Sequence, residues 1–111
     1  MKDLFLKIIN REIPGDFLYE DDVCVAIYDK FPETKGHFLV IPKKWSQNLT
    51  EMDDETTAHI FKVVKKLAKQ EILDKDIPGF KILINTNEVA DQTIFHTHIH
   101  VIPIREKNEL L

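Results

Sequence analysis

Apolar residues recur at helical spacing in two parts of the chain and form short strand-like runs in several others. A short amphipathic helix is predicted near the amino terminus, where positions 4, 5, 8 and 9 are apolar, and a longer one from about Asp53 to Asp74. Runs rich in β-branched and aromatic residues predict strands at about 17–19, 23–28, 37–41, 80–84 and 93–104. This order predicts an α+β fold, in which helices cover a single antiparallel sheet.

The longer helix has the clearest pattern, because its apolar positions share one face and its lysines fall mostly elsewhere. We expect one set to be buried, namely Ile60, Phe61, Val64, Leu67, Ala68 and Ile72, and the other to be solvated, namely Lys62, Lys65, Lys66 and Lys69. Thr50 or Asp53 is expected to cap the start of this helix, since either side chain can accept a hydrogen bond from the first free amides.

Composition narrows the class of protein. The chain has 111 residues, enough for a single domain over 1–111, and its 43% apolar and 31% charged residues are typical of a globular protein without a membrane span. A formal net charge of −4 argues against a nucleic-acid partner, although one nucleotide needs only local donors. Cys24 is the only cysteine, so an intramolecular disulfide is excluded and a cytoplasmic location is expected.

The segment from His96 to His100 is the strongest candidate for a functional site. Successive side chains of a strand point to opposite faces, so the histidines at 96, 98 and 100 are expected to line one surface. Neighbouring imidazoles would then lie roughly 6.5 Å apart along the strand, close enough for both to bind the same phosphate group. Three of the chain's five histidines, counting 96, 98 and 100, fall in this segment, a concentration that packing alone does not require.

The residues alone leave three interpretations of these histidines open. They are strand histidines satisfied by hydrogen bonds, or they bind zinc or a related ion through neutral imidazole nitrogens. In the third interpretation one neutral imidazole attacks phosphorus, while its neighbours orient it, protonate the leaving group and stabilise the growing charge. A metal would need a further ligand from outside the segment, such as Asp29 or Cys24.

Motifs along nearly the whole chain carry a family resemblance. Residues 96–102, with the sequence His-Thr-His-Ile-His-Val-Ile, resemble the His-x-His-x-His-x-x signature of the histidine triad (HIT) nucleotide-binding family. Residues 7–14, 19–22 and 36–43 resemble the opening segment, the first turn and the central strand of that family. The order and spacing are most similar to the small bacterial proteins of the Hint branch. Those proteins form homodimers with a continuous sheet and hydrolyse bonds at the α-phosphate of purine nucleotides.

The resemblance implies a catalytic set of four histidines. By that resemblance His98 is the nucleophile that becomes transiently nucleotidylated, and water then hydrolyses the intermediate. His96, His100 and His37 assist by orientation and by contacts around the phosphate and the leaving group. No metal or other cofactor takes part in this chemistry, and none is expected here.

The resemblance also implies a nucleotide-binding set. Asp29 matches the position that takes the ribose hydroxyls, and its two acceptor oxygens suit a vicinal diol. Lys30, the next residue, is expected to belong to the same nucleotide-binding set. Four apolar residues stand at the positions that form the family's base-binding slot, and by residue type they could equally belong to the hydrophobic core, namely Phe5, Ile8, Ile13 and Ile27. In the segment before the histidine motif, four residues stand at positions that lie around the phosphate in the family, namely Asn85, Asp91, Gln92 and Thr93.

The chain departs from the family pattern in two places. Asn87 and Asp91 stand where the family usually has glycines, which let the backbone approach a phosphate closely. Like charges about 4 Å apart repel by roughly 4 kcal/mol at an effective dielectric constant near 20, so we expect the Asp91 carboxylate to point to solvent. Leu6 and Ile9 stand where some bacterial relatives bind a structural zinc with a Cys-x-x-Cys pair, and no such zinc is expected.

The leading functional hypothesis is therefore a hydrolase of purine nucleoside phosphoramidates or related adenylates that works through a nucleotidyl-His98 intermediate. A dinucleoside polyphosphate hydrolase uses the same triad but needs room for a second nucleoside. A nucleotide-binding module with little catalysis is the alternative from another class, and the altered loop at Asn87 and Asp91 supports it. The expected partners are a purine nucleotide and a second copy of the chain.

Overall fold

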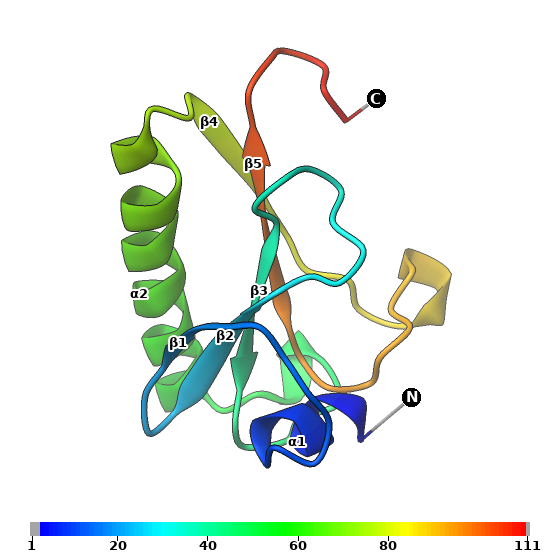
Figure 1. Ribbon diagram of the computed structural model, residues 1–111. Coiled ribbons are helices and arrows are strands. Elements are labelled where there is room, and N and C mark those ends of the chain that lie inside the picture. The colour runs from blue at the N-terminus through cyan, green and yellow to red at the C-terminus, as the bar shows by residue number, and fades with distance from the viewer. Residues whose placement is uncertain (1–2, 111) are drawn as a thin grey trace.

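The computed structural model describes residues 3–110 and contains one five-stranded sheet with two α-helices (Figure 1). In chain order the main elements are α1 (Leu4–Ile9), β1 (Phe17–Glu20), β2 (Cys24–Tyr28), β3 (Phe38–Pro42), α2 (Asp54–Glu71), β4 (Gly79–Leu83) and β5 (Ile99–Ile104). Short 3-10 helices lie between them, η1 (Leu49–Glu51), η2 (Leu73–Lys75) and η3 (Glu88–Ala90). The strand order is β1-β2-β3-β5-β4 with every pair antiparallel, so the predicted α+β fold is confirmed.

Each face of the sheet has its own apolar cluster. Figure 1 shows α2 in green beside the sheet and α1 in blue at the lower end of the molecule. α2 packs on one face, where its Ile60 and Leu67 belong to the same cluster as Val40 of β3, while Phe5 and Ile8 of α1 belong to the cluster on the other face. Because strand side chains alternate, β2 and β3 supply both clusters and are buried along almost their whole length.

Side-chain oxygens fix the turns and ends of these elements. Asp21 joins β1 to β2, where its Oδ1 accepts the N–H groups of Val23 and Cys24, both at 2.8 Å. Asp53 caps α2 by accepting the Thr56 N–H at 2.8 Å, which confirms one of the two predicted caps.

One position on α2 was wrongly predicted. Phe61 is 38% exposed, whereas Val63 is buried. Val63 lies three positions after Ile60 and so shares its face, while Phe61 is turned about 100° away from Ile60 around the helix. The other expected core residues, Ile60, Val64, Leu67, Ala68 and Ile72, are buried, and the expected surface residues, Lys62, Lys65, Lys66 and Lys69, are exposed.

The predicted bounds of two strands also need correction. β3 includes Pro42, which pairs with Cys24, although the strand was predicted to end at about residue 41. β5 begins at Ile99 rather than at about Thr93, so His96 and His98 precede the strand and His100 lies in it. Among residues 3–110 no helix is long and apolar enough to cross a membrane.

Candidate active site

The segment before β5 is held by the loop that follows β3. The Thr97 N–H donates to the Ser46 carbonyl oxygen at 2.9 Å, and the Trp45 indole N–H donates to the Phe95 carbonyl oxygen at 2.8 Å. The hydroxyl oxygens of Ser46 and Thr97 lie 2.7 Å apart, and both residues are buried. Hydrogen bonds to this loop therefore position the segment, in place of the strand pairing that the sequence predicted.

His98 has the ring best placed to act as a nucleophile. Its Nδ1 lies 2.7 Å from the His96 carbonyl oxygen. A carbonyl oxygen can only accept, so Nδ1 carries the proton and Nε2 keeps its lone pair. Burial lowers the pKa of His98, against the opposing effects of this hydrogen bond and of the Asp29 charge. The ring is therefore neutral near pH 7, with an unprotonated Nε2.

His96 lies deeper and acts on its neighbour through the backbone. Its Nε2 donates to the Pro42 carbonyl oxygen at 2.7 Å, and burial lowers the pKa of the ring. Its Nδ1 is buried without a hydrogen-bond partner among the residues that the structure describes. The Phe5 ring meets the rings of both His96 and His98 edge-on, with centroid distances of 5.9 and 4.9 Å. These contacts hold the carbonyl group that orients His98.

His37 and His100 form a hydrogen-bonded pair with fixed proton positions. His37 Nδ1 accepts the Glu33 N–H at 3.0 Å, and His37 Nε2 lies 3.0 Å from His100 Nδ1. Neutral His37 must then carry its proton on Nε2 and donate it to His100, which leaves the His100 proton on Nε2. Burial lowers the pKa of both rings, that of His100 to about 4. The His98 and His100 ring centroids are 5.0 Å apart, so this donor lies beside the His98 ring.

Asp29 connects the histidines with the following turn. Its Oδ2 lies 3.6 Å from His37 Nε2, and its Oδ1 accepts the Phe31 N–H at 2.9 Å. Each carboxylate oxygen has a second acceptor position, so the side chain can still take a hydroxyl group from a ligand.

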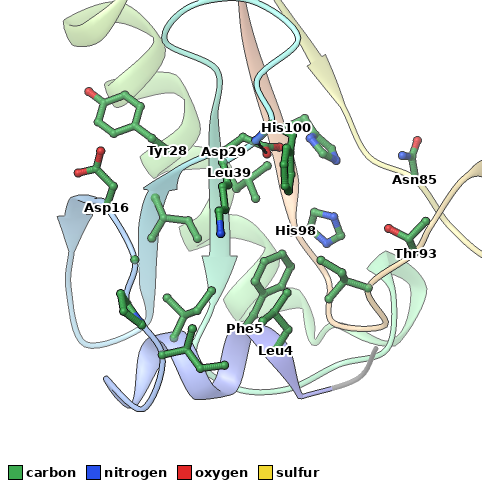
Figure 2. Close-up of a pocket in the computed structure, with 18 of the residues that line it drawn as sticks. Leu4, Phe5, Asp16, Tyr28, Asp29, Leu39, Asn85, Thr93, His98 and His100 are labelled. Atoms are coloured by element: carbon green, nitrogen blue, oxygen red, sulfur yellow. Dashed lines mark hydrogen bonds between the residues drawn. The ribbon is translucent and has the colours of Figure 1, made fainter.

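A cavity of about 1070 Å³ opens beside these rings (Figure 2). Most of the predicted site residues line it, namely Phe5, Ile8, Ile13, Ile27, Asp29, Lys30, Asn85, Asp91, Thr93, His98 and His100. Figure 2 shows His98, Asn85 and Thr93 at one end and Asp16 with Tyr28 at the other. Phe5 and Leu39 lie between these ends, so the cavity runs from a polar end through an apolar middle.

Three predicted residues do not line this cavity. His37 and His96 lie behind it and hold the two rings that do, as described above. Gln92 is buried, and its Oε1 accepts the Asn87 N–H at 2.8 Å while its Nε2 donates to the Gln47 carbonyl oxygen at 2.7 Å. The Gln92 side chain therefore braces the loop before β5.

Comparison with known proteins places the chain in a family. The model of the HIT domain matches residues 10–107. The chain belongs to the HIT family. It is 49% identical over 106 residues to a 13.1 kDa HIT-like protein of Mesomycoplasma hyorhinis, covering 96% of each chain. A crystal structure of a HIT family protein from Bacillus anthracis superposes with a TM-score of 0.90 at 40% identity, covering 96% of this chain and 75% of that one. An adenylylsulfatase of Arabidopsis thaliana is 38% identical over 105 residues, which cover 95% of this chain and 53% of that protein.

The loop before β5 keeps a backbone suited to glycine at the two positions where the HIT pattern leads us to expect it. Asn87 has φ 73° and ψ 159°, and Asp91 has φ 69° and ψ 21°. Aspartate tolerates the left-handed helical region that Asp91 occupies, whereas the region of Asn87 belongs essentially to glycine. Asp91 is exposed and lines the cavity, and its carbonyl oxygen accepts from Asn85 Nδ2 at 3.4 Å.

The substitution Asn87→Gly is expected to stabilise the protein by about 1 kcal/mol. Relief of the backbone strain at Asn87, roughly 1–3 kcal/mol, outweighs the greater conformational entropy of glycine in the unfolded chain. Urea denaturation of the two proteins measures the difference. Asp91→Gly is the matched control and should change the free energy of unfolding much less, because that conformation is tolerated. A loss of stability in Asn87→Gly would contradict the strain at this position.

Sequence reasoning missed several residues of the cavity. Leu39 and Tyr28 belong to the paired strands β2 and β3, and Gly15, Asp16 and Phe31 come from the connecting loops. Leu39 could have been found from the strand pairing, since it lies opposite Ile27, which was predicted. Tyr28 could not, because it follows Ile27 in the strand and packs against the cluster on the other face. The loop residues carried no periodic signal.

Two groups of side chains among residues 3–110 offer metal-ligating atoms within 4.8 Å of one another, Asp29 with His37 and His100, and Asp21 with Cys24 and His59. Hydrogen bonds already join members of each group, including one of 2.7 Å between Asp21 Oδ2 and His59 Nε2. Asp21 also accepts the Tyr19 hydroxyl at 2.8 Å, so it ties β1 to α2. The expected absence of a metal from the reaction stays a prediction.

Proposed function

We propose that the protein hydrolyses purine nucleoside phosphoramidates or related adenylates by attack of His98 Nε2 on the α-phosphorus. The observation that carries this proposal is the hydrogen bond from His98 Nδ1 to the His96 carbonyl oxygen. It directs the free lone pair of a neutral imidazole away from the backbone, and His98 lines the cavity.

The first chemical step forms a P–N bond to His98 and breaks the bond between phosphorus and the leaving group. The displaced amine takes up one proton as it leaves. Charge grows on the phosphate oxygens, and the Nε2–H of His100, fixed by its hydrogen bond with His37, is the adjacent donor for that charge.

The second step returns the enzyme to its starting state. Water attacks the phosphorus of the nucleotidyl-His98 intermediate, the P–N bond breaks, and Nε2 recovers its lone pair. One proton is released, which balances the proton taken up by the amine. Throughout both steps the His98 Nδ1–H keeps its hydrogen bond to the His96 carbonyl oxygen, and this bond stabilises the positive charge of the substituted ring.

The shape of the cavity supports a nucleotide as the occupant. With the phosphate at His98 and His100, Asp29 is positioned to accept the ribose hydroxyls. The base then lies among Phe5, Ile8 and Ile27, where it buries apolar surface. The similarity to a plant adenylylsulfatase supports the same class of chemistry at an adenylyl phosphorus.

Hydrolysis of a purine nucleoside phosphoramidate tests the proposal, with a dinucleoside polyphosphate as the comparison substrate. We expect release of the amine and of the nucleoside monophosphate, with the phosphoramidate turned over faster. Faster cleavage of the dinucleoside polyphosphate would assign the protein to that hydrolase class instead. Binding of the nucleoside monophosphate without turnover of either substrate would identify a binding module.

The sheet edge supports a homodimer. β4 is an edge strand, and its Ile82 and Leu83 are 45% and 47% exposed. An edge strand presents unpaired backbone N–H and C=O groups, which a second copy of the same strand can pair to give a continuous sheet. We therefore propose that two chains associate along β4, and a monomer in sedimentation equilibrium would contradict this.

The single cysteine supports a reducing compartment, and we propose the cytoplasm. Cys24 lies fully buried in β2. Burial raises the pKa of its thiol to about 12, and the Asp21 carboxylate acts in the same direction, so the thiol stays protonated.

A further inference from the structure

Two charged residues of the cavity have no part in the chemistry at phosphorus. Asp16 and Lys30 both line the cavity. Figure 2 shows Asp16 at the end opposite to His98, beyond the apolar middle. A nucleotide whose phosphate meets His98 directs its base toward this end, where Asp16 lies.

The loop that carries Asp16 is held close to α1. Gly15 packs so tightly that a Cβ at this position would lie 2.6 Å from Ile8 Cγ2, so the loop approaches the helix in a way that a larger residue would prevent. The Asp16 carbonyl oxygen accepts the Tyr28 N–H at 3.0 Å, which fixes residue 16 at the end of β2. Its carboxylate has no hydrogen-bond or ion-pair partner among residues 3–110.

Lys30 is fixed by a turn. Asp29 Oδ1 accepts the Phe31 N–H, so the backbone on both sides of Lys30 is held, and the residue lies next to the carboxylate proposed to bind ribose. Within the described part of the chain, the ammonium group forms no ion pair. The base slot is therefore bordered by one free cation and, at its far end, by one free carboxylate.

We propose that Asp16 and Lys30 make this site select guanine over adenine, an inference that rests on the proposed function. Guanine presents acceptors at O6 and N7 and donors at N1–H and N2–H₂, whereas adenine presents a donor at N6 in place of O6. Lys30 can only donate, so it suits O6 and N7, and Asp16 can only accept, so it suits N1–H and N2–H₂. Adenine in the same position would bring its N6 donor against the Lys30 ammonium group, which is also a donor. Its N1 lone pair would face the Asp16 carboxylate, which is also an acceptor, so both contacts are unfavourable.

The affinities of GMP, IMP and AMP, measured by calorimetry on the full chain, test this selection. These monophosphates are products of the proposed reaction, so turnover does not interfere. Both charged groups are exposed to solvent, and we expect GMP to bind about tenfold more tightly than AMP. IMP keeps O6 and N1–H but lacks the N2 amine, and it should bind with intermediate affinity.

Two substitutions test whether Asp16 and Lys30 cause the preference for guanine. Asp16→Ala should weaken GMP binding and tighten AMP binding slightly, because it removes both the acceptor for N1–H and N2–H₂ of guanine and the group that opposes adenine N1. Lys30→Met should act in the same sense. Asp22→Ala and Lys65→Met change the net charge equally at exposed positions outside the cavity, and they should keep the GMP preference.

Each possible outcome bears on the inference. Equal affinities for GMP and AMP, or tighter binding of AMP, would overturn the guanine preference while leaving the proposed function intact. A GMP preference that survives in both Asp16→Ala and Lys30→Met would overturn the assignment to these residues. Failure to bind any of the three nucleotides would overturn the proposed function, and the base preference with it.

Discussion

Replacing His98 with alanine is expected to lower the turnover of a purine nucleoside phosphoramidate by at least about 1,000-fold. The loss of the proposed nucleophile removes the covalent route, and what remains is the rate supplied by binding and by charge stabilisation. Steady-state release of the amine measures this effect. Affinity for the nucleoside monophosphate product should fall much less, because His98 supplies only one of the contacts to the nucleotide.

His98→Asn separates nucleophilicity from packing. The asparagine amide can still donate to the His96 carbonyl oxygen, which preserves the bond at Nδ1, but it offers no nitrogen lone pair to phosphorus. It should be as inactive as His98→Ala while unfolding closer to the wild-type temperature. Turnover at the wild-type rate in either variant would end the covalent mechanism.

The free energy of unfolding is expected to fall by several kcal/mol between pH 6.5 and pH 4. Burial lowers the pKa of His37, His96, His98 and His100 in the folded protein, that of His100 to about 4. Below pH 6.5 the unfolded chain therefore binds protons that the folded chain does not. Each such proton removes about 1.4 kcal/mol of stability per pH unit until the folded pKa is reached.

Urea denaturation at a series of pH values measures this loss. Carboxylates with a lowered pKa, such as Asp21, give up their own contribution only at lower pH, as the unfolded chain takes up protons near pH 4. His100→Gln is the informative variant, because it removes the ring whose pKa is lowered to about 4 and should flatten the slope between pH 6.5 and 4. A stability that stays constant over this range would show that the histidines are protonated in the folded state.

The sequence predicted the elements of the fold because periodicity depends mainly on which face is buried. On α2 the spacing of Ile60, Val64 and Leu67 identified the buried side, and only Phe61 was misplaced. The start of β5 was harder to predict, because alternating residues such as His96 and His98 look the same whether they pair in a sheet or bind a loop. The partners of that segment, Trp45 and Ser46, are distant in sequence and carried no pattern pointing to it.

The candidate site was predictable as far as the family motif extends. His98 and His100 came from that motif, and both line the cavity. The proton positions depend on the Glu33 N–H, which donates to His37, and on the His96 carbonyl oxygen, which accepts from His98, and no side-chain pattern reveals either bond. Asp16 was missed for the same reason, since the close approach of Gly15 to Ile8 becomes visible only when the chain is folded.

The hydrogen bonds between residues 95–97 and the loop after β3 affect how the protein opens. Sheet amides exchange with solvent deuterium when strands separate, but the Thr97 amide is bound to Ser46 outside the strand ladder. The Thr97 amide therefore exchanges when the hydrogen bonds between residues 95–97 and the loop after β3 break, which can happen while the five strands stay paired. Thr97, the residue next to His98, thus belongs to a different unit of local stability from the sheet. We expect that a change at Trp45 or Ser46 can displace His98 without unfolding the domain.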